Sequence, residues 1–370
     1  MTETKKIYRE IDILKGVAIA MVLLGHSIIE FPIDLSQVSW CFFLHVFVSS
    51  AHMPLFFAIS GYCFSFHGWG DYLRKKCRRI LIPYLVFSVL GVLMKTLFPS
   101  VVNGSVSLSR LAFSILTGGQ HWFLYALFVI FLFFPLVSRF FEKGGPAAWI
   151  VLALACLLQL FPFWPTLFDI DRIVKFFPFF ALGYTVRCQI RCEPDTGKRL
   201  LRLVKHPLTL ALCLIAWALL TALRVPLENQ ADAAEEAMKT VGSVLGQSSG
   251  AMRFFGIIPA EYGPLFFRLS LVTLAAALAG VPALIGLTLR FCSLRASRLV
   301  EIAGKDSLQL YLFNGYLLTI TRWLVVTKLH ITTPAFVITA NFLVIFFFSL
   351  AVIELIVRRV KLFRTLTGMV

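Results

Sequence analysis

The chain has 370 residues, of which 59% are hydrophobic and 15% are charged, whereas a typical globular protein has roughly 45–50% apolar and 25% charged residues. It has too little polar surface for a soluble multidomain protein, and the same composition excludes a disordered chain and a disulfide-stapled secreted fold. The formal net charge of +16 would suit a polyanion, but in a membrane protein the distribution of Lys and Arg matters more than the total.

Ten apolar runs approach the ~20 residues that a helix needs to cross the ~30 Å hydrocarbon core of a bilayer. The first run follows a basic tail and lacks a small-residue cleavage site, so we interpret it as a retained helix. We therefore predict an all-α, polytopic membrane protein whose residues 1–370 form one domain. The predicted spans are Ile11–Ile29, Cys41–Phe66, Ile80–Phe98, His121–Val137, Ala147–Phe163, Ile173–Val186, Pro207–Leu223, Leu265–Leu289, Leu308–Val326 and Ala335–Val357.

The basic residues between these spans favour one orientation. With the N-terminus in the cytoplasm, the inside segments carry 24 Lys and Arg residues and the outside segments carry 6. Because Lys and Arg accumulate in cytoplasmic loops, both termini are predicted to be cytoplasmic, and the charge needs no nucleic-acid partner. The largest outside loop, about residues 224–264, contains an Ala-rich stretch predicted to form a short surface helix, and it is too short to be a separate catalytic domain.

The eight cysteines are scattered along the chain. Cys188 and Cys192 form the closest pair, in a basic loop on the predicted cytoplasmic side, where disulfides are disfavoured. No histidine or second cysteine pair lies nearby at the spacing of a zinc site. We expect plain thiols and no metal.

Titratable residues inside a span are informative because holding them in a bilayer costs several kcal/mol unless they are paired or hydrated. The first span has Asp12 and Lys15 near its cytoplasmic end and His26 deeper. Asp12 precedes Lys15 by three residues, so the two can pair. Lys15 and His26 share a helix face, about 16 Å apart along the axis. A neutral imidazole can take a proton from a hydroxyl; the alternatives are an end-of-helix charge for Lys15 and an interhelical hydrogen bond for His26.

The second span combines His45 and His52 with Pro54, Ser60 and Gly61. Proline frees backbone groups, and glycine beside serine permits close approach of another helix, so this span is predicted to be bent and tightly packed. Packing alone does not require a histidine at position 52. We therefore take His52 and Ser60 as candidate substrate contacts.

A cytoplasmic run of five cations precedes the third span: Arg74, Lys75, Lys76, Arg78 and Arg79. One interpretation is a topology anchor beside anionic lipid. The other is a phosphate site, because clustered guanidinium and ammonium groups suit the phosphates of a nucleotide-containing donor such as coenzyme A.

Polar residues also open two later spans. Gln120, His121 and Trp122 precede or begin the fourth, where Trp122 is a candidate interface anchor and Gln120 or His121 a candidate substrate contact. Asp306 or Ser307 is expected to cap the helix of the ninth. The other charges near span ends are interpreted as structural pairs or snorkelling side chains: Lys175, Arg268, Arg322 and Glu354.

Together these motifs resemble acyltransferase family 3, the integral-membrane O-acyltransferases with which bacteria modify cell-surface sugars. Lys15 and His26 fit the family's pattern of a basic residue, ten residues and a histidine. Residues 56–61 fit its second-span signature, residues 76–79 its Arg-x-x-Arg motif, and residues 303–314 its late glycine-rich segment. The similarity extends over most of the chain, with the order and spacing of the motifs intact.

Two departures from the family pattern stand out. The Arg-x-x-Arg pair aligns as Lys76 and Arg79, which puts a point charge where the family has a bidentate fork. Relatives often carry histidine where this chain has Asn314. A second imidazole is therefore either absent or supplied by one of three others: His45, His52 or His121.

The resemblance implies that acetyl-CoA or another acyl-CoA binds the basic run from the cytoplasm, and that a hydroxyl of an envelope polysaccharide or lipid-linked glycan is acylated from the other side. His26 would be essential, assisted by Lys15 and Asp12, as a base or as a transient acyl carrier. The substrate contacts would include Asn314. We expect a location in the bacterial inner membrane, among membrane lipid. With no fused extracytoplasmic transferase domain expected, the membrane core would complete the transfer or pass the acyl group to a separate partner.

Two other functions remain open from the sequence. A transporter or flippase of a sugar-linked substrate would also bury Lys, Asp and His, but it would move its substrate without covalent change. A sensor or partner-binding protein on an acyltransferase-like frame would be favoured by Lys76 and Asn314.

Overall fold

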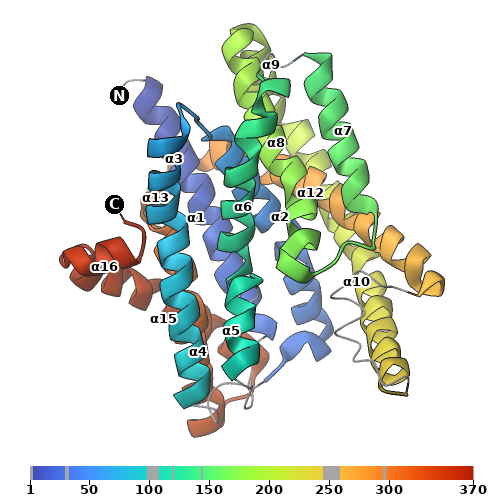
Figure 1. Ribbon diagram of the computed structural model, residues 1–370, viewed down its shortest axis with the longest axis vertical. Helices are drawn as coiled ribbons and strands as arrows, with labels where there is room; N and C mark the ends of the chain where they lie inside the picture. The colour runs from blue at the N-terminus through green and yellow to red at the C-terminus, as the bar shows by residue number, and fades with distance from the viewer. Residues whose placement is uncertain are drawn as a thin grey trace. The chain divides into compact units, whose positions relative to one another are not determined.

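The computed structural model describes residues 3–29, 33–97, 108–118, 121–142, 145–244, 259–294 and 297–369, and in these ranges every regular element is helical (Figure 1). The all-α prediction is thus confirmed. The chain divides into two compact units. Unit 1 comprises residues 1–52, 66–128 and 287–370, and unit 2 comprises residues 53–65 and 129–286.

Unit 1 is built from helices of both ends of the chain. The helices that lie in it or begin in it are α1 (Glu3–Ile29), α2 (Ser39–Tyr62), α3 (Trp69–Lys76), α4 (Ile82–Leu97), α5 (Leu108–Leu116), α6 (Trp122–Val137), α13 (Ser297–Lys305), α14 (Ser307–Arg322), α15 (Pro334–Val352) and α16 (Lys361–Leu366). Short π-helical turns at Cys77–Leu81, Trp323–Lys328 and Ile353–Val357 extend α3, α14 and α15.

Unit 2 contains the ends of α2 and α6 together with the middle of the chain. Its further helices are α7 (Pro146–Leu160), α8 (Ile170–Cys192), α9 (Pro194–Lys205), α10 (Pro207–Val244) and most of α12 (Gly263–Phe291).

Seven helices of the described residues are long and apolar enough to cross a membrane: Arg9–Ile29, Ser39–Tyr62, Trp69–Leu97, Trp122–Phe140, Pro207–Met238, Gly263–Phe291 and Pro334–Val357. The other three predicted spans fall on α7 and α14, which have 15 and 16 residues, and on α8, which carries charged residues near both ends. The count of ten and the cytoplasmic termini therefore stay predictions.

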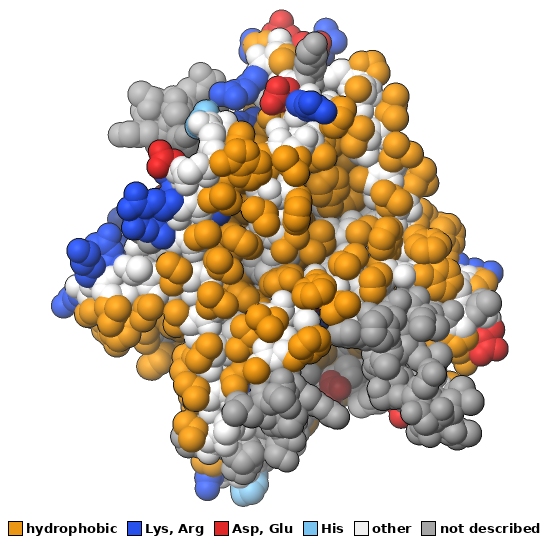
Figure 2. Space-filling view, in the orientation of Figure 1, with side chains coloured by type: hydrophobic (Ala, Val, Ile, Leu, Met, Phe, Trp, Pro, Cys, Tyr) orange, Lys and Arg blue, Asp and Glu red, His pale blue; other side chains and the backbone are white. Residues whose placement is uncertain are grey.

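Large apolar side chains stay exposed along one face of several helices. On α4 they recur at helical spacing, as at Leu85, Val89 and Leu93, and on α10 at Leu212, Ile215 and others. Figure 2 shows hydrophobic side chains across the visible faces of α4 and α7, and Lys and Arg gathered beside α16. Apolar stripes of this extent suit contact with lipid rather than with water.

The α10 helix corrects the expected outside loop. It continues through Arg224 as one helix of 38 residues instead of ending near Leu223 before a separate surface helix. Arg224 and Glu228 form an ion pair of 2.6 Å one turn apart. Farther along, Ala231 packs with Phe266 of α12 in a buried cluster, so tertiary packing sustains the helix beyond its apolar part.

Two pairs of helices cross with their backbones in contact. In unit 1 a Cβ on Gly16 would lie 2.8 Å from the carbonyl carbon of Val300, and one on Gly304 would lie 2.6 Å from that of Asp12, so α1 and α13 interlock through reciprocal glycines. In unit 2 Gly61 and Gly183 bring α2 against α8 in the same way. The close approach predicted for Gly61 is therefore present.

Candidate active site

The ionisable face of α1 is the centre of the candidate site. Lys15 Nζ lies 3.3 Å from Asp12 Oδ1, which confirms the predicted pair, and both side chains are partly exposed. His26 is half-buried in the last turn of the same helix. Because α1 is continuous from Glu3 to Ile29, Lys15 and His26 remain about 16 Å apart along one helix face.

Residues on both sides of His26 are held by other helices. His45 on α2 has Nδ1 3.3 Å from the carbonyl oxygen of Gly25. A carbonyl only accepts, so this contact assigns the proton to Nδ1 of His45. On the other side, Arg322 of α14 donates from Nη2 to the carbonyl oxygens of Ser27, at 2.8 Å, and Ile28, at 3.2 Å.

The sequence analysis missed this role of Arg322. It is fully buried, with 0% of its surface exposed, so it does not snorkel, and it donates to backbone carbonyls at this end of α1. The signal that could have pointed to it was an arginine inside the ninth predicted span, since a charge there needs a partner within the protein.

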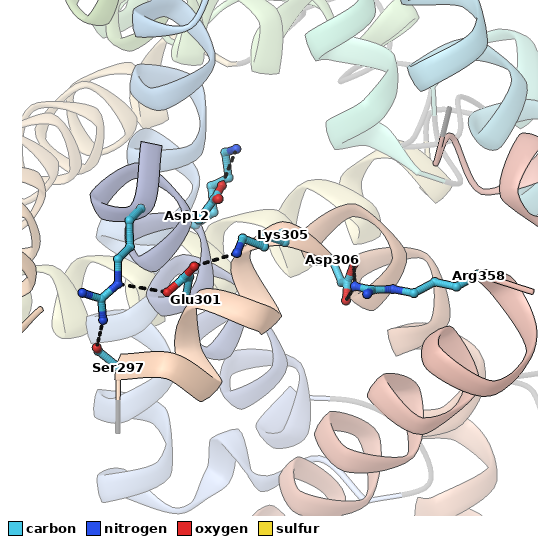
Figure 3. A network of polar contacts seen from close by, with 8 residues as sticks. Asp12, Ser297, Glu301, Lys305, Asp306 and Arg358 are labelled. Carbon is cyan, nitrogen blue, oxygen red and sulfur yellow. Dashed lines mark hydrogen bonds and ion pairs between the residues drawn. The ribbon is translucent and has the colours of Figure 1, made fainter. Parts of the chain in front are cut away.

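A chain of polar contacts fastens the first turns of α1 to α13 (Figure 3). Arg9 Nε donates to Glu301 Oε2 at 3.0 Å, and Arg9 Nη2 donates to Ser297 Oγ at 3.0 Å. Lys305 Nζ donates to the other Glu301 oxygen at 2.6 Å. The Lys305 hydrogen bond, together with the weaker contribution of Arg9, lowers the pKa of Glu301, so this carboxylate is ionised at neutral pH.

The basic run forms the end of α3 and the π-helical turn after it. Arg74, Lys75 and Arg78 are exposed and make no ion pair with a carboxylate of the described residues. Lys76 Nζ lies 5.5 Å from the centre of the Tyr72 ring, a cation–π contact. Arg79 is also exposed. Exposed cations without carboxylate partners among the described residues, as at Arg74, Lys75 and Arg78, attract phosphate groups.

The C-terminal segment packs beside this run. The α16 helix contacts α4, and a Cβ on Gly368 would lie 2.6 Å from the carbonyl oxygen of Arg79. Gln309 of α14 donates from Nε2 to the carbonyl oxygen of Thr367 at 2.9 Å. The C-terminal segment therefore contacts the backbone of the basic run.

Asp306 occupies the N-cap position of α14 but makes no side-chain cap hydrogen bond. Its carboxylate instead accepts from Arg358 Nη2, at 3.0 Å and 2.8 Å (Figure 3). Asp306 is only 3% exposed, and burial raises its pKa although Arg358 opposes the shift. Glu354, predicted to be a structural pair, lies 3.2 Å from Arg358 Nη1.

The structure places His121 among aromatic rings. Its ring centre lies 6.0 Å from that of Tyr311 and 6.5 Å from those of Tyr316 and Phe87, which come from α14 and α4. Trp122, the next residue, is half-buried.

The other predicted substrate contacts come from different elements, with His52 and Ser60 on α2 and Asn314 on α14. Asn314 is 2% exposed, and its Oδ1 has no hydrogen-bond partner among the described residues. His52 is buried, with Nδ1 2.6 Å from the carbonyl oxygen of Val48 on its own helix. Ser60 belongs to unit 2, and Gln120 lies outside the described residues. The structure brings His45 and Arg322 to the turn of His26, through Gly25 on one side and Ser27 and Ile28 on the other.

The eight cysteines are free thiols. The described part of the chain contains no group of three or more His, Cys, Asp or Glu side chains that could hold a metal ion.

The fold and this arrangement define a polytopic membrane protein with ionisable side chains inside a helical bundle. Residues 8–357 match the model of the acyltransferase domain that defines acyltransferase family 3. The chain therefore belongs to this family of membrane acyltransferases, as its motifs predicted.

Two curated relatives are similar to about half of the chain. The nodulation protein NolL of Mesorhizobium japonicum is 28% identical over 184 residues, 47% of this chain and 46% of the relative. The nodulation protein NolL of Sinorhizobium fredii is 31% identical over 196 residues, 51% of each. The chain thus spans about half the length of the curated relatives it matches. No solved structure matches it.

Proposed function

We propose that this protein transfers an acetyl or other short acyl group from cytoplasmic acyl-CoA to a hydroxyl of an envelope polysaccharide or lipid-linked glycan. The observation that carries the proposal is the ionisable face of α1. A half-buried His26 sits at one end of this face, and the Asp12–Lys15 pair sits about 16 Å nearer the N-terminal end of the helix. An acyl group bound to a large coenzyme cannot cross a bilayer freely, so donor and acceptor must meet inside the protein.

The basic run supports the donor half of the proposal. The side chains of Arg74, Lys75 and Arg78 are exposed and form no ion pair with a carboxylate of the described residues. Their positive charges fit the phosphates of coenzyme A. Lys76, held over Tyr72, and Arg79 would complete this surface. Because Lys76 offers a single ammonium group, the bidentate contact would come from Arg79.

His26 would act on the acceptor. As the hydroxyl oxygen attacks the thioester carbonyl carbon, the imidazole takes the hydroxyl proton, and a tetrahedral intermediate forms. The intermediate collapses by breaking the carbon–sulfur bond, and the proton passes to the departing thiolate. The products are the ester and free coenzyme A. Lys15, partly neutralised by Asp12, would draw the anionic donor toward the helix.

The remaining expected contacts belong to the acceptor side. His121 and Trp122, beside the rings of Tyr311 and Tyr316, would offer aromatic faces to a sugar. Asn314 would supply an amide, because its Oδ1 has no hydrogen-bond partner in the described part of the chain. The glycan would enter from the face opposite to the coenzyme, in a chain whose termini are cytoplasmic and whose membrane is the bacterial inner membrane.

The test is mass spectrometry of envelope glycans from cells lacking the gene and complemented with the wild type, His26→Ala or His206→Ala. His206 is an exposed histidine at the start of α10 and serves as the matched control. We expect one acyl unit per acceptor with the wild type and His206→Ala, and none with His26→Ala. Full acylation with His26→Ala would remove His26 from the mechanism. Glycans that change their side of the membrane without changing mass would identify a flippase instead.

A further inference from the structure

The end of α1 carries both the candidate catalytic residue and an unusual capping partner. The last four carbonyl oxygens of a helix have no partner within the helix, and in α1 these belong to residues 26–29. Inside a bilayer, unsatisfied carbonyls cost several kcal/mol each. In α1 two of them, those of Ser27 and Ile28, accept from the buried guanidinium of Arg322.

We infer that Arg322 is a positioning residue for acyl transfer, which holds the last turn of α1 so that the His26 imidazole meets the reacting hydroxyl. The inference rests on the proposed role of His26. Arg322 donates to the carbonyl oxygens of Ser27 and Ile28 and so acts on His26 through the peptide groups that follow it.

Contacts on both sides of His26 hold this turn in place. Ser27 is fully buried, and its hydroxyl donates to the carbonyl oxygen of Leu23 at 2.8 Å, so both its side chain and its carbonyl are bound. Gly25, on the other side of His26, is contacted by His45. His26 is thus a half-buried residue between two neighbours that α2 and α14 hold in place.

The charge of Arg322 adds to this geometry. The C-terminal end of a helix carries a partial negative charge, which a cation stabilises, and a guanidinium presents several donors in a rigid plane that can serve two carbonyls at once. Ile28 belongs to a buried cluster with Val325 and Val337. The turn therefore has apolar packing of its own and depends on Arg322 chiefly for the direction of its carbonyls.

Unit 2 offers a matched control for a purely structural role. Arg187 of α8 donates from Nη1 to the carbonyl oxygens of Tyr62, at 3.2 Å, and of Phe64. It therefore binds the carbonyls at the end of α2 as Arg322 binds those at the end of α1. Arg187 lies in no part of the candidate active site, so Arg187→Lys removes the same kind of contact away from His26.

The experiment uses the full-length protein in lipid nanodiscs, with acetyl-CoA as donor and the acceptor glycan found by the envelope analysis. Arg322→Lys keeps a charge and one donor group but loses the planar fork. Because a misplacement of 1 Å can cost about 100-fold in rate, we expect kcat to fall by about 10- to 100-fold, with the KM for acetyl-CoA changed less than about twofold. Arg187→Lys should leave kcat within about twofold of the wild type.

Hydrogen exchange measured by mass spectrometry supplies a readout that does not depend on activity. We expect faster exchange over residues 23–29 in Arg322→Lys and over residues 58–65 in Arg187→Lys. If Arg322→Lys does not fold, Arg322→Gln takes its place, because the glutamine amide donates two N–H groups without a charge. We expect the same loss of kcat in the monodisperse fraction of Arg322→Gln.

The outcomes separate this inference from the proposed function. Wild-type protein that transfers no acyl group in this assay overturns the proposed function and, with it, the role given to Arg322. Wild-type transfer that His26→Ala abolishes, combined with a kcat in Arg322→Lys or Arg322→Gln within twofold of the wild type, overturns the positioning role alone. An equal loss of kcat in Arg187→Lys overturns it as well, because the effect would then be general.

Discussion

Replacing Gly304 by alanine tests how strictly the site depends on the contact between α1 and α13. The new Cβ would overlap the carbonyl oxygen of Asp12, and it would lie 2.6 Å from the carbonyl carbon of Asp12 and 2.8 Å from the amide nitrogen of Gly16, whereas ordinary contacts begin at 3.4 Å. The two helices would have to separate by more than ~0.8 Å, because the carbonyl oxygen is closer to the new Cβ than the carbonyl carbon is. All these atoms are backbone, so no side chain can turn aside to relieve the clash.

Overpacking of this kind costs about 1–3 kcal/mol, and we expect Gly304→Ala at the upper end because both helices are rigid. The displaced carbonyl belongs to Asp12, the partner of Lys15, so donor-dependent acyl transfer should fall together with stability. The assay combines thermal unfolding in nanodiscs with acetyl transfer. The contacts of Arg9 with Glu301 and Ser297 would still tether α1 to α13, which predicts a displaced but folded protein.

Gly315 is the matched control. It also lies inside a helix, α14, but a Cβ there would meet nothing within 4 Å. Gly315→Ala should therefore be neutral or stabilise the protein by up to about 1 kcal/mol. Equal unfolding temperatures and equal activity of Gly304→Ala and the wild type would refute the argument that backbone contact between α1 and α13 sets the position of Asp12.

Two other consequences can be measured. Replacing Arg74, Lys75 and Arg78 together by Gln should raise the KM for acetyl-CoA about tenfold, at about 0.5 kcal/mol per charge, and leave kcat nearly unchanged. A triple variant with the wild-type KM, together with a KM that does not depend on salt concentration, would exclude this run as the phosphate site. Arg358→Met removes the ion-pair partner of the buried Asp306 carboxylate. Burial already raises the pKa of Asp306, and losing the opposing effect of Arg358 raises this pKa further. A carboxyl whose pKa is higher in the folded protein than in the unfolded chain, where it is near 3.9, loses stabilising free energy as the pH rises through the folded-state pKa. The variant should therefore be clearly less stable than the wild type at pH 7 and nearly equal to it near pH 4. A stability difference that does not change with pH would contradict this.

The sequence by itself determined the class of this protein. Apolar runs of span length admit no water-facing fold, and the family motifs lie in order along the chain. The pair of Asp12 and Lys15 was also predictable, because residues three apart on a helix are neighbours whatever surrounds them. Local spacing fixes such contacts before any tertiary structure forms.

Only the tertiary structure decided which distant residues meet. Arg322 is 296 residues from His26 in the chain, yet α14 brings its guanidinium to the carbonyls of the following turn. The course of α10 past Arg224 likewise depended on packing against α12 rather than on local composition. A charged residue within a hydrophobic span indicates from the sequence that a partner is needed. It does not indicate which partner, because every residue has a carbonyl group. Helix packing alone therefore selects which one it binds.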